Sequence, residues 1–217
     1  MTMGDVERNN VPRKDFRVLL MYMDIVNTIT NICLGGAAFA AIIFAQVPGV
    51  PTVWRSHIVL VTLGYLLMLT QTLTSINKAT GWTRMLKDNP RKIAHLVVEL
   101  MGVTMVIAGT SLAVANPLMP LASMSSHGIV GLTALALTVL TTLGGIANFF
   151  LSENTPLPTG LIHLYLGSLA LIIGFIAFTM GVHKIYMYPT ATLVSVLAII
   201  GLIGTISNAF LSRFKLK

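Results

Sequence analysis

Six long apolar segments dominate the pattern of hydrophobic and polar positions along the chain. They cover approximately residues 19–46, 57–77, 93–115, 127–151, 161–183 and 191–212. Each provides roughly the 20 residues that a helix needs to cross a hydrocarbon core of about 30 Å. All nine prolines lie between these segments, where they do not interrupt helical hydrogen bonding. The pattern therefore predicts an all-α integral membrane bundle of six transmembrane helices.

The composition supports a membrane protein and argues against several other classes. The 217 residues are 55% hydrophobic and 10% charged, with a mean hydropathy of +0.83, whereas about a quarter of the residues in a soluble domain are charged. The loops are short and contain no glycine-rich nucleotide-binding motif, so no flavin or NAD(P)H domain is expected. The single cysteine, Cys33, allows no intrachain disulfide. The net charge of +7 comes from residues that flank the apolar segments, so no nucleic-acid partner is expected.

The distribution of basic residues predicts the orientation in the bilayer. With a cytoplasmic N-terminus, the tail, the loop 78–92 and the C-terminal end hold 12 of the 14 lysines and arginines, and the opposite side holds only Arg55 and Lys184. An excess of this kind marks the cytoplasmic side of a membrane protein. We therefore expect a cytoplasmic tail at 1–18, a six-helix domain at 19–217 and both termini in the cytoplasm.

The second to fifth segments share one arrangement, in which a histidine near the start is followed by a glycine on the same helical face. The histidines are His57, His95, His127 and His163, and the glycines are Gly64, Gly102, Gly131 and Gly167. Offsets of seven and four residues return to the same side of a helix. Because successive helices run in opposite directions, the first and third histidines are predicted on the non-cytoplasmic side and the other two on the cytoplasmic side. The two layers would lie roughly 20 Å apart.

Two imidazoles from neighbouring helices suit a six-coordinate haem, whose iron takes axial ligands on opposite faces. Glycine beside each histidine would leave room for the macrocycle. A structural zinc site fits less well, because it needs four nearby nitrogen or sulfur ligands. A single histidine near a membrane surface is also a common interfacial residue. The repetition in four consecutive helices favours a four-helix di-haem core formed by helices two to five.

Other polar residues within or near the apolar segments are secondary candidates. Glu99 lies one turn after His95 on the same face, and an ionisable residue inside a membrane is a functional hypothesis by default. We expect its carboxyl to be protonated or hydrogen-bonded near the cytoplasmic haem, where it helps to couple proton and electron movement; a neutral carboxyl satisfied by a neighbouring helix is the alternative. His183 is expected to be an interfacial residue rather than a ligand. Asp24 and Asn148 are candidates for similar structural parts.

The histidine-bearing segments resemble the cytochrome b561 family, whose members are six-helix proteins with two haem b groups held by histidines on helices two to five. The matching stretches are Ser56-His57, Arg91-Lys92-Ile93-Ala94-His95, Ser126-His127-Gly128-Ile129-Val130-Gly131 and His163-Leu164-Tyr165-Leu166-Gly167-Ser168. The short termini and the closing Ser207-Asn208-Ala209-Phe210-Leu211 are most similar to a small animal branch of the family. The resemblance covers nearly the whole chain. It implies that His57 pairs with His127 and that His95 pairs with His163.

The resemblance also implies transmembrane electron transfer. Cytosolic ascorbate would reduce the cytoplasmic haem, and the other haem would reduce monodehydroascorbate or ferric chelates across the membrane. A basic cytoplasmic rim suits the ascorbate anion, although the same charges also serve topology. The rim candidates are Lys78, Arg84, Lys87, Arg91 and Lys92. Residues 70–78 lack the arginine-bearing segment found at the end of helix two in the best-known ascorbate users, which leaves the donor open.

On the far side, the polar groups nearest the outer haem are Arg55, Ser125, Ser126 and Lys184, which are weak candidates for an acceptor site. The resemblance suggests a homodimer and an endomembrane location, in the endoplasmic reticulum or vesicles, rather than the plasma membrane. Two other functions stay open. A histidine-lined proton or metal transporter would need no haem, but transporters usually have discontinuous helices or more carboxylates at mid-membrane. A haem-binding structural or sensor subunit would show no turnover with ascorbate.

Overall fold

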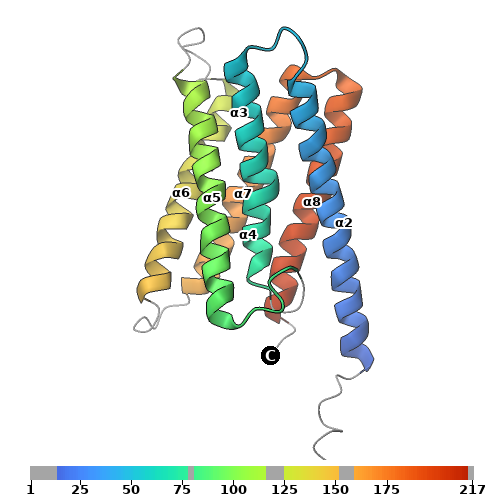
Figure 1. Ribbon diagram of the computed structural model, residues 1–217, viewed down its shortest axis with the longest axis vertical. Coiled ribbons are helices and arrows are strands. Elements are labelled where there is room, and N and C mark those ends of the chain that lie inside the picture. The colour runs from blue at the N-terminus through green and yellow to red at the C-terminus, as the bar shows by residue number, and fades with distance from the viewer. Residues whose placement is uncertain (1–13, 78–80, 116–124, 152–158, 215–217) are drawn as a thin grey trace, which may run out of the picture.

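The computed structural model describes residues 14–77, 81–115, 125–151 and 159–214 of the chain. Within these residues all regular structure is helical, and six spans are long and apolar enough to cross a membrane. The predicted all-α architecture with six membrane helices is therefore confirmed. The elements are α2 (Lys14–Ala45), α3 (Thr52–Thr62), η1 (Leu63–Leu69), α4 (Thr70–Ser75), α5 (Asp88–Val114), α6 (Ser126–Leu151), α7 (Thr159–Ile185) and α8 (Tyr188–Phe214). Figure 1 shows the spans running along the long axis of the molecule.

Several helices begin earlier than their apolar segments. The helix α5 starts at Asp88, five residues before its apolar segment, and contains Pro90 in its first turn. Proline is tolerated there because the first amide groups of a helix have no intrahelical partner. The negative charge of Asp88 is stabilised by the positive end of the helix dipole. Pro189 also lies in the first turn of its helix, α8, and Pro51 immediately precedes α3. Hydropathy alone does not detect these polar first turns.

The second span is irregular, because the π-helical segment η1 joins α3 to α4. The hydroxyl of Thr70 donates to the carbonyls of Leu66 and Leu67, at 2.7 and 2.9 Å. Side-chain hydroxyls of this kind satisfy carbonyls whose helical bonding is altered, which a membrane interior requires. The span therefore continues through the irregularity to Ser75.

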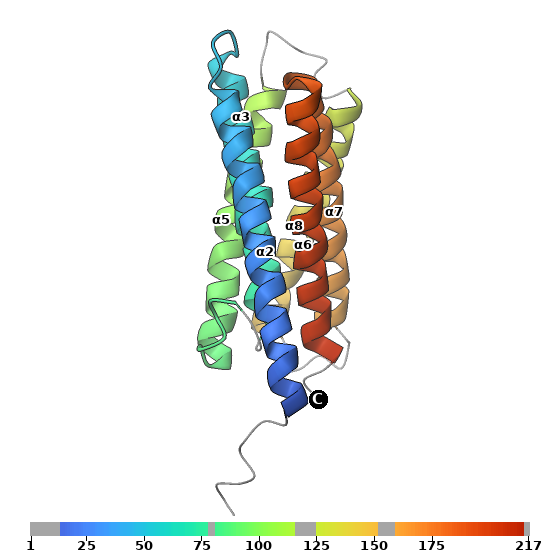
Figure 2. The same cartoon turned by 90° about the vertical axis from the view of Figure 1, so that its right-hand side faces the viewer.

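The spans form a four-helix core with two further helices beside it. The core consists of the second span (α3, η1 and α4), α5, α6 and α7, while α2 and α8 pack together along one side (Figures 1 and 2). The helices α2 and α8 approach each other closely at glycines of α8, which have no side chain. A Cβ on Gly201 would lie 2.5 Å from Leu34, and one on Gly204 would overlap Thr30. Small residues permit this close contact between membrane helices.

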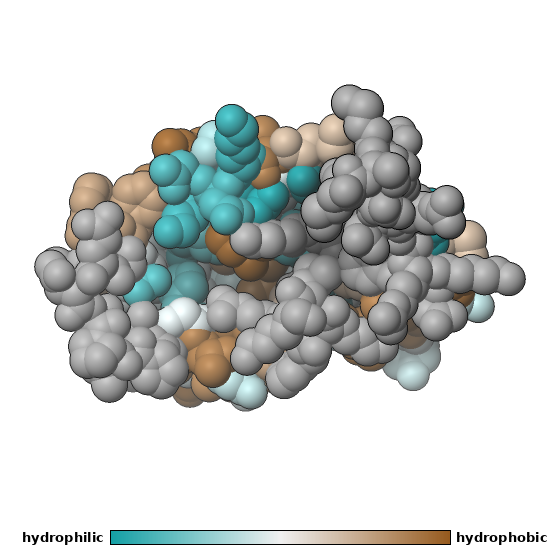
Figure 3. Space-filling model, turned by 90° about the horizontal axis from the view of Figure 1, so that it is seen from below, coloured by the Kyte–Doolittle hydropathy of each residue, from teal (hydrophilic) through white to brown (hydrophobic). Residues whose placement is uncertain are grey.

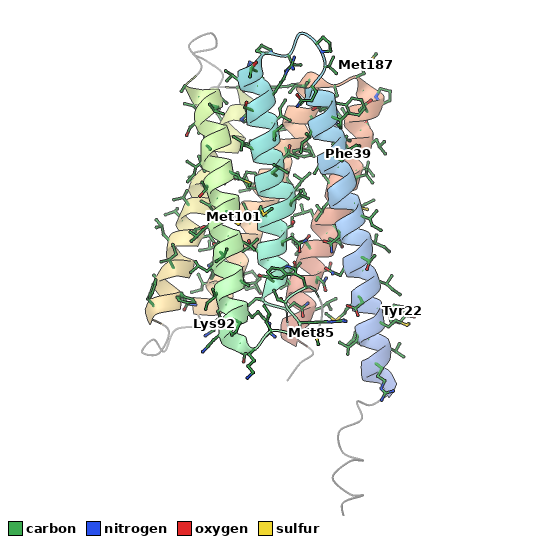
Figure 4. The ribbon with its side chains drawn as sticks, viewed as in Figure 1. Tyr22, Phe39, Met85, Lys92, Met101 and Met187 are labelled. Atoms are coloured by element: carbon green, nitrogen blue, oxygen red, sulfur yellow. The ribbon has the colours of Figure 1, made fainter. Side chains whose placement is uncertain are left out.

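The interior and the surface are both apolar, as expected for a protein in lipid. Leu66, Val106 and Phe175 are almost fully buried in the core. Large apolar side chains such as Phe39 and Met101 are exposed on the outside of the bundle, as Figure 4 shows. The outer face therefore suits the hydrocarbon of a bilayer, and polar groups of functional interest are those inside the four-helix core.

Candidate functional site

The four histidines at the starts of core helices form two pairs, one towards each end of the bundle. The imidazole centroids of His57 and His127, on α3 and α6, are 6.3 Å apart, and the ring planes make an angle of 83°. Those of His95 and His163, on α5 and α7, are 6.0 Å apart at 74°. The two pairs are those expected from the alternating directions of the helices.

Backbone carbonyls fix the rings of His57 and His127. The Nδ1 atom of His57 lies 2.8 Å from the carbonyl oxygen of Gly109 in α5, and Nδ1 of His127 lies 2.9 Å from that of Ala177 in α7. A carbonyl oxygen only accepts hydrogen bonds, so Nδ1 carries the hydrogen in both rings. The lone pair of each neutral imidazole is therefore on Nε2, where it is available to a metal.

The ring of His95 is fixed in the same tautomer by two acceptors. Its Nδ1 lies 2.9 Å from the carbonyl oxygen of Thr72 and 3.1 Å from Oγ of Ser75, both in α4. Because the carbonyl requires a donor, Nδ1 again carries the hydrogen and Nε2 carries the lone pair. Three of the four histidines are thus oriented as metal ligands by neighbouring helices.

The spacing of the imidazoles fits two axial ligands on one iron. A metal–nitrogen distance of about 2.1 Å, with about 1.1 Å more from nitrogen to ring centre on each side, gives about 6.4 Å between centroids. The two pairs, at 6.3 and 6.0 Å, agree with this value. The donor set, two neutral imidazoles at each site, is also that of a six-coordinate haem. The residues present therefore fit haem at both positions.

Two glycines that the sequence analysis missed lie directly against histidine rings. A Cβ on Gly145 of α6 would come within 2.7 Å of Cε1 of His163, and a Cβ on Gly181 of α7 would come within 2.9 Å of Cε1 of His127. Each of these glycines follows the histidine of its own helix by 18 residues, which is five helical turns. The shared helical face was the signal that would have found them.

The four glycines predicted beside the haems have different surroundings. A Cβ on Gly64 would meet Val106 at 2.6 Å, and one on Gly102 would meet Met68 at 2.9 Å, so both lie at the close contact between η1 and α5. Gly131 has no atom within 4 Å of such a Cβ, and Gly167 has only ordinary contact, 3.5 Å from the Thr141 methyl group. Of the four predicted glycines, only Gly131 on α6 therefore has open space beside it, whereas Gly167 is in ordinary contact and Gly64 and Gly102 are tightly packed.

A cavity of about 270 Å³ lies between His95 and His163. Its walls come from η1, α4, α5, α6 and α7 and are mainly apolar, with Lys92 and Asn148 among the polar lining residues. Figure 3 views this end of the bundle and shows hydrophilic side chains gathered on part of its surface, and Figure 4 places Lys92 near the lower end of α5. Lys92 therefore belongs both to the wall of this mainly apolar cavity and to the end of the bundle that carries the hydrophilic side chains.

Glu99 lies inside this cavity and is 5% exposed. Its Oε1 accepts a hydrogen bond of 3.0 Å from the Thr142 hydroxyl, and its Oε2 lies 3.6 Å from Nε2 of His95. One ligand atom from each of Glu99, His95 and His163 falls within 4.8 Å of the others. A carboxyl thus lies on the ligating side of His95 and is a third potential ligand, which the sequence analysis did not consider because it weighed zinc on nitrogen and sulfur ligands alone.

The basic rim predicted from the sequence is divided by the structure. Arg91 is buried, and its guanidinium donates to the carbonyls of Thr83 and Leu86 and to the Asp88 carboxylate, so it is a structural residue and not part of an exposed rim. Arg84 pairs with Asp24 at 3.1 Å.

Lys87 and Lys92 are both exposed, and of the two only Lys92 lines the cavity. Lys78 lies outside the described residues.

At the opposite end of the bundle, the four residues predicted for an acceptor site have different contacts. Arg55 donates to the carbonyls of Val50 and Val47 and so fastens the loop between α2 and α3. The hydroxyl of Ser125 accepts from the Gly128 amide at the start of α6. The remaining two candidates, Ser126 and Lys184, are exposed, as is His183, whose ring contacts Tyr188.

Comparison with known proteins gives one match. The family model described as eukaryotic cytochrome b561 matches residues 56–188, which is more than half of the chain and includes all four paired histidines. No curated protein and no solved structure matches the chain.

Proposed function

The chain belongs to the eukaryotic cytochrome b561 family, and from this premise we propose that it transfers electrons across a membrane from cytosolic ascorbate to an acceptor on the other side. Members of the family are transmembrane oxidoreductases that bind haem b. The chain is accordingly a multi-pass membrane protein of the electron-transport class. The proposal adds two haem b groups per chain, the donor, and monodehydroascorbate or ferric iron as acceptor.

The observation that carries the proposal is the presence of two imidazole pairs with ligand-like spacing at opposite ends of one helical core. His57 and His127 would hold one haem, and His95 and His163 would hold the other. When bound, the two haem groups would each accept and release single electrons. The chain's own residues hold three of the four imidazoles, those of His57, His95 and His127, in one tautomer through the carbonyls of α4, α5 and α7. The mainly apolar walls of the cavity at His95 and His163 would disfavour water beside the bound group.

Lys92 is the residue best placed to attract an anionic donor. It is exposed and lines the cavity at His95, and Asn148 lines the same cavity. A cation at the mouth of a cavity with apolar walls raises the local concentration of an anion. Ascorbate would therefore approach at this end, which the distribution of basic residues assigns to the cytoplasm together with both termini.

Other aspects of the proposal rest on family resemblance. Among the described residues, Lys184 is an exposed cation at the end of α7 that an acceptor on the non-cytoplasmic side could meet. We propose an endomembrane location and a homodimer, with α2 and α8 beside the four-helix core as the helices available for contact with a second copy.

One observation favours a second candidate function. Glu99 joins His95 and His163 in a group of three metal-ligating side chains, and a site of two histidines and one carboxylate suits a divalent transition metal. A histidine-lined metal transporter without haem would use this group as its ion site. The pair formed by His57 and His127 has no described carboxylate in such a group, so the transporter reading explains one end of the bundle and leaves the other unexplained.

An optical spectrum of the purified protein in detergent tests the proposal. Haem would be quantified per chain, and spectra recorded before and after addition of ascorbate. Two low-spin haem b groups per chain, at least partly reduced by ascorbate, are the expected result. A folded protein without haem would reject the proposal in favour of the transporter, and bound haem that ascorbate does not reduce would reject the donor.

A further inference from the structure

Three buried side chains form a hydrogen-bonded link between the loop segment 81–87 and His95. Nε of Arg91 donates to the carbonyl of Thr83 at 3.4 Å, and the hydroxyl of Thr83 donates to the carbonyl of Ser75. Oγ of Ser75 in turn contacts Nδ1 of His95 at 3.1 Å. Arg91, Thr83 and Ser75 are all at most 5% exposed, so water does not compete for these bonds.

The donor and the acceptor of the hydrogen bond between Ser75 and His95 follow from the other bond that Ser75 makes. The Ser75 hydroxyl donates its hydrogen to the carbonyl of Thr72, at 2.7 Å. Towards His95 the Ser75 oxygen is therefore an acceptor, and the Nδ1 hydrogen of His95 has two acceptors, Ser75 Oγ and the Thr72 carbonyl. Within the described chain, His57 and His127 each donate to a single carbonyl. The two histidine pairs are therefore inequivalent in their hydrogen bonding.

Building on the proposed function, we infer that Ser75 and Thr83 are positioning residues that lower the reduction potential of the haem held by His95 and His163. A stronger acceptor environment at Nδ1 makes Nε2 more basic, and a more basic axial ligand stabilises ferric over ferrous iron. The effect is confined to one haem, because Ser75 contacts only the histidine at its own end. A lower potential at the donor end favours electron flow outward.

The same link makes the potential depend on the loop. The Thr83 hydroxyl fixes the carbonyl of the last residue of α4, and Arg91 fixes Thr83. Loss of either contact would release Ser75 from its position against His95. The loop segment 81–87 thus controls a haem ligand without itself touching the metal.

Redox titration of the haem-loaded protein tests the inference. Ser75→Ala and Thr83→Val would each be placed in a His57→Ala background, so that the remaining haem is the one held by His95 and His163. At a fixed ambient potential, the ratio of reduced to oxidised haem should rise roughly two- to fivefold in both variants, as loss of one hydrogen bond implies. Thr83→Ser, which retains the hydroxyl, should restore the original ratio.

Thr74→Ala is the matched control, because this neighbouring hydroxyl donates to the carbonyls of Thr70 and Gln71 in its own helix. In a His95→Ala background, Ser75→Ala should leave the other haem unchanged. An unchanged ratio in both test variants, or an equal rise in the control, would overturn the inference while leaving the proposed function intact. Should Ser75→Ala fail to fold, the ratio of reduced to oxidised haem in Thr83→Val, together with the electron paramagnetic resonance g-values of its ferric haem, decides the question. Absence of haem from the unmodified protein would instead reject the proposed function.

Discussion

Gly145 lies against the imidazole of His163, so closely that a Cβ on the glycine would come within 2.7 Å of the ring. Gly181 has the same relationship to His127, at 2.9 Å. The two helices α6 and α7 therefore each contribute one histidine and one glycine that receives the partner's histidine. Because neither ring could keep its position beside a larger residue, these glycines set the orientation of the proposed ligands.

We predict that Gly145→Ala selectively weakens the haem held by His95 and His163, and that Gly181→Ala weakens the other. The added methyl group must displace the ring, and overpacking of this kind costs about 1–3 kcal/mol, which is roughly 5- to 150-fold in affinity. Haem content per chain and the optical spectrum of each purified variant would measure the loss. Gly144→Ala is the control, because a Cβ there meets nothing within 4 Å. Equal haem loss in Gly144→Ala would contradict the prediction.

Histidine substitutions should separate the two haems. His95→Ala or His163→Ala should remove one haem and stop reduction by ascorbate, whereas His57→Ala or His127→Ala should remove the other and leave ascorbate reduction intact. The reason is that the imidazole rings form two separate pairs, with centroids 6.0 Å apart for His95 and His163 and 6.3 Å apart for His57 and His127. Stopped-flow spectra in proteoliposomes, with a ferric chelate outside, would show a block of electron exit in the second group. Loss of the same haem in His57→Ala and His95→Ala would be incompatible with the two-site arrangement.

Glu99→Gln should distinguish haem from a divalent metal ion at the His95 end. The amide can accept the Thr142 hydrogen bond, which is 3.0 Å in the native protein, but it removes the only carboxylate of the three-residue group. We expect two haems per chain to remain, because two imidazoles complete the axial coordination. Haem assay and elemental analysis of the same sample provide the measurement. A haem-free protein that loses a bound transition metal on this substitution would support the transporter instead.

Lys92→Gln should raise the KM for ascorbate roughly two- to fivefold with little change in kcat, as expected for loss of one exposed charge interaction. Lys92→Arg should retain most of the affinity, since it keeps the charge at the cavity mouth. Steady-state reduction kinetics would measure both constants. An uncharged electron donor is the internal control, because its KM should not respond to either substitution. The same rise in KM for the uncharged donor would exclude an electrostatic role.

Much of the architecture could be predicted from hydropathy and charge. The six spans were recognisable because a membrane helix needs a continuous apolar segment, and proline positions marked the connections. Helix starts such as Asp88 were missed, because polar first turns lie outside the apolar pattern. The histidines were recognisable because imidazole is rare in such segments and was repeated in four of them.

The six spans, and the order of the four imidazoles on alternating helices, follow from residue type and periodicity along the chain. What surrounds each imidazole depends instead on how the helices pack. The acceptors at Gly109, Ala177 and Thr72 are backbone carbonyls, which every residue possesses and no sequence pattern reveals. The burial of Arg91 likewise depends on how the loop folds back over α5, since a guanidinium whose donors meet carbonyls can leave water. Contacts between helices distant in the chain thus separate structural residues from those that can bind a ligand.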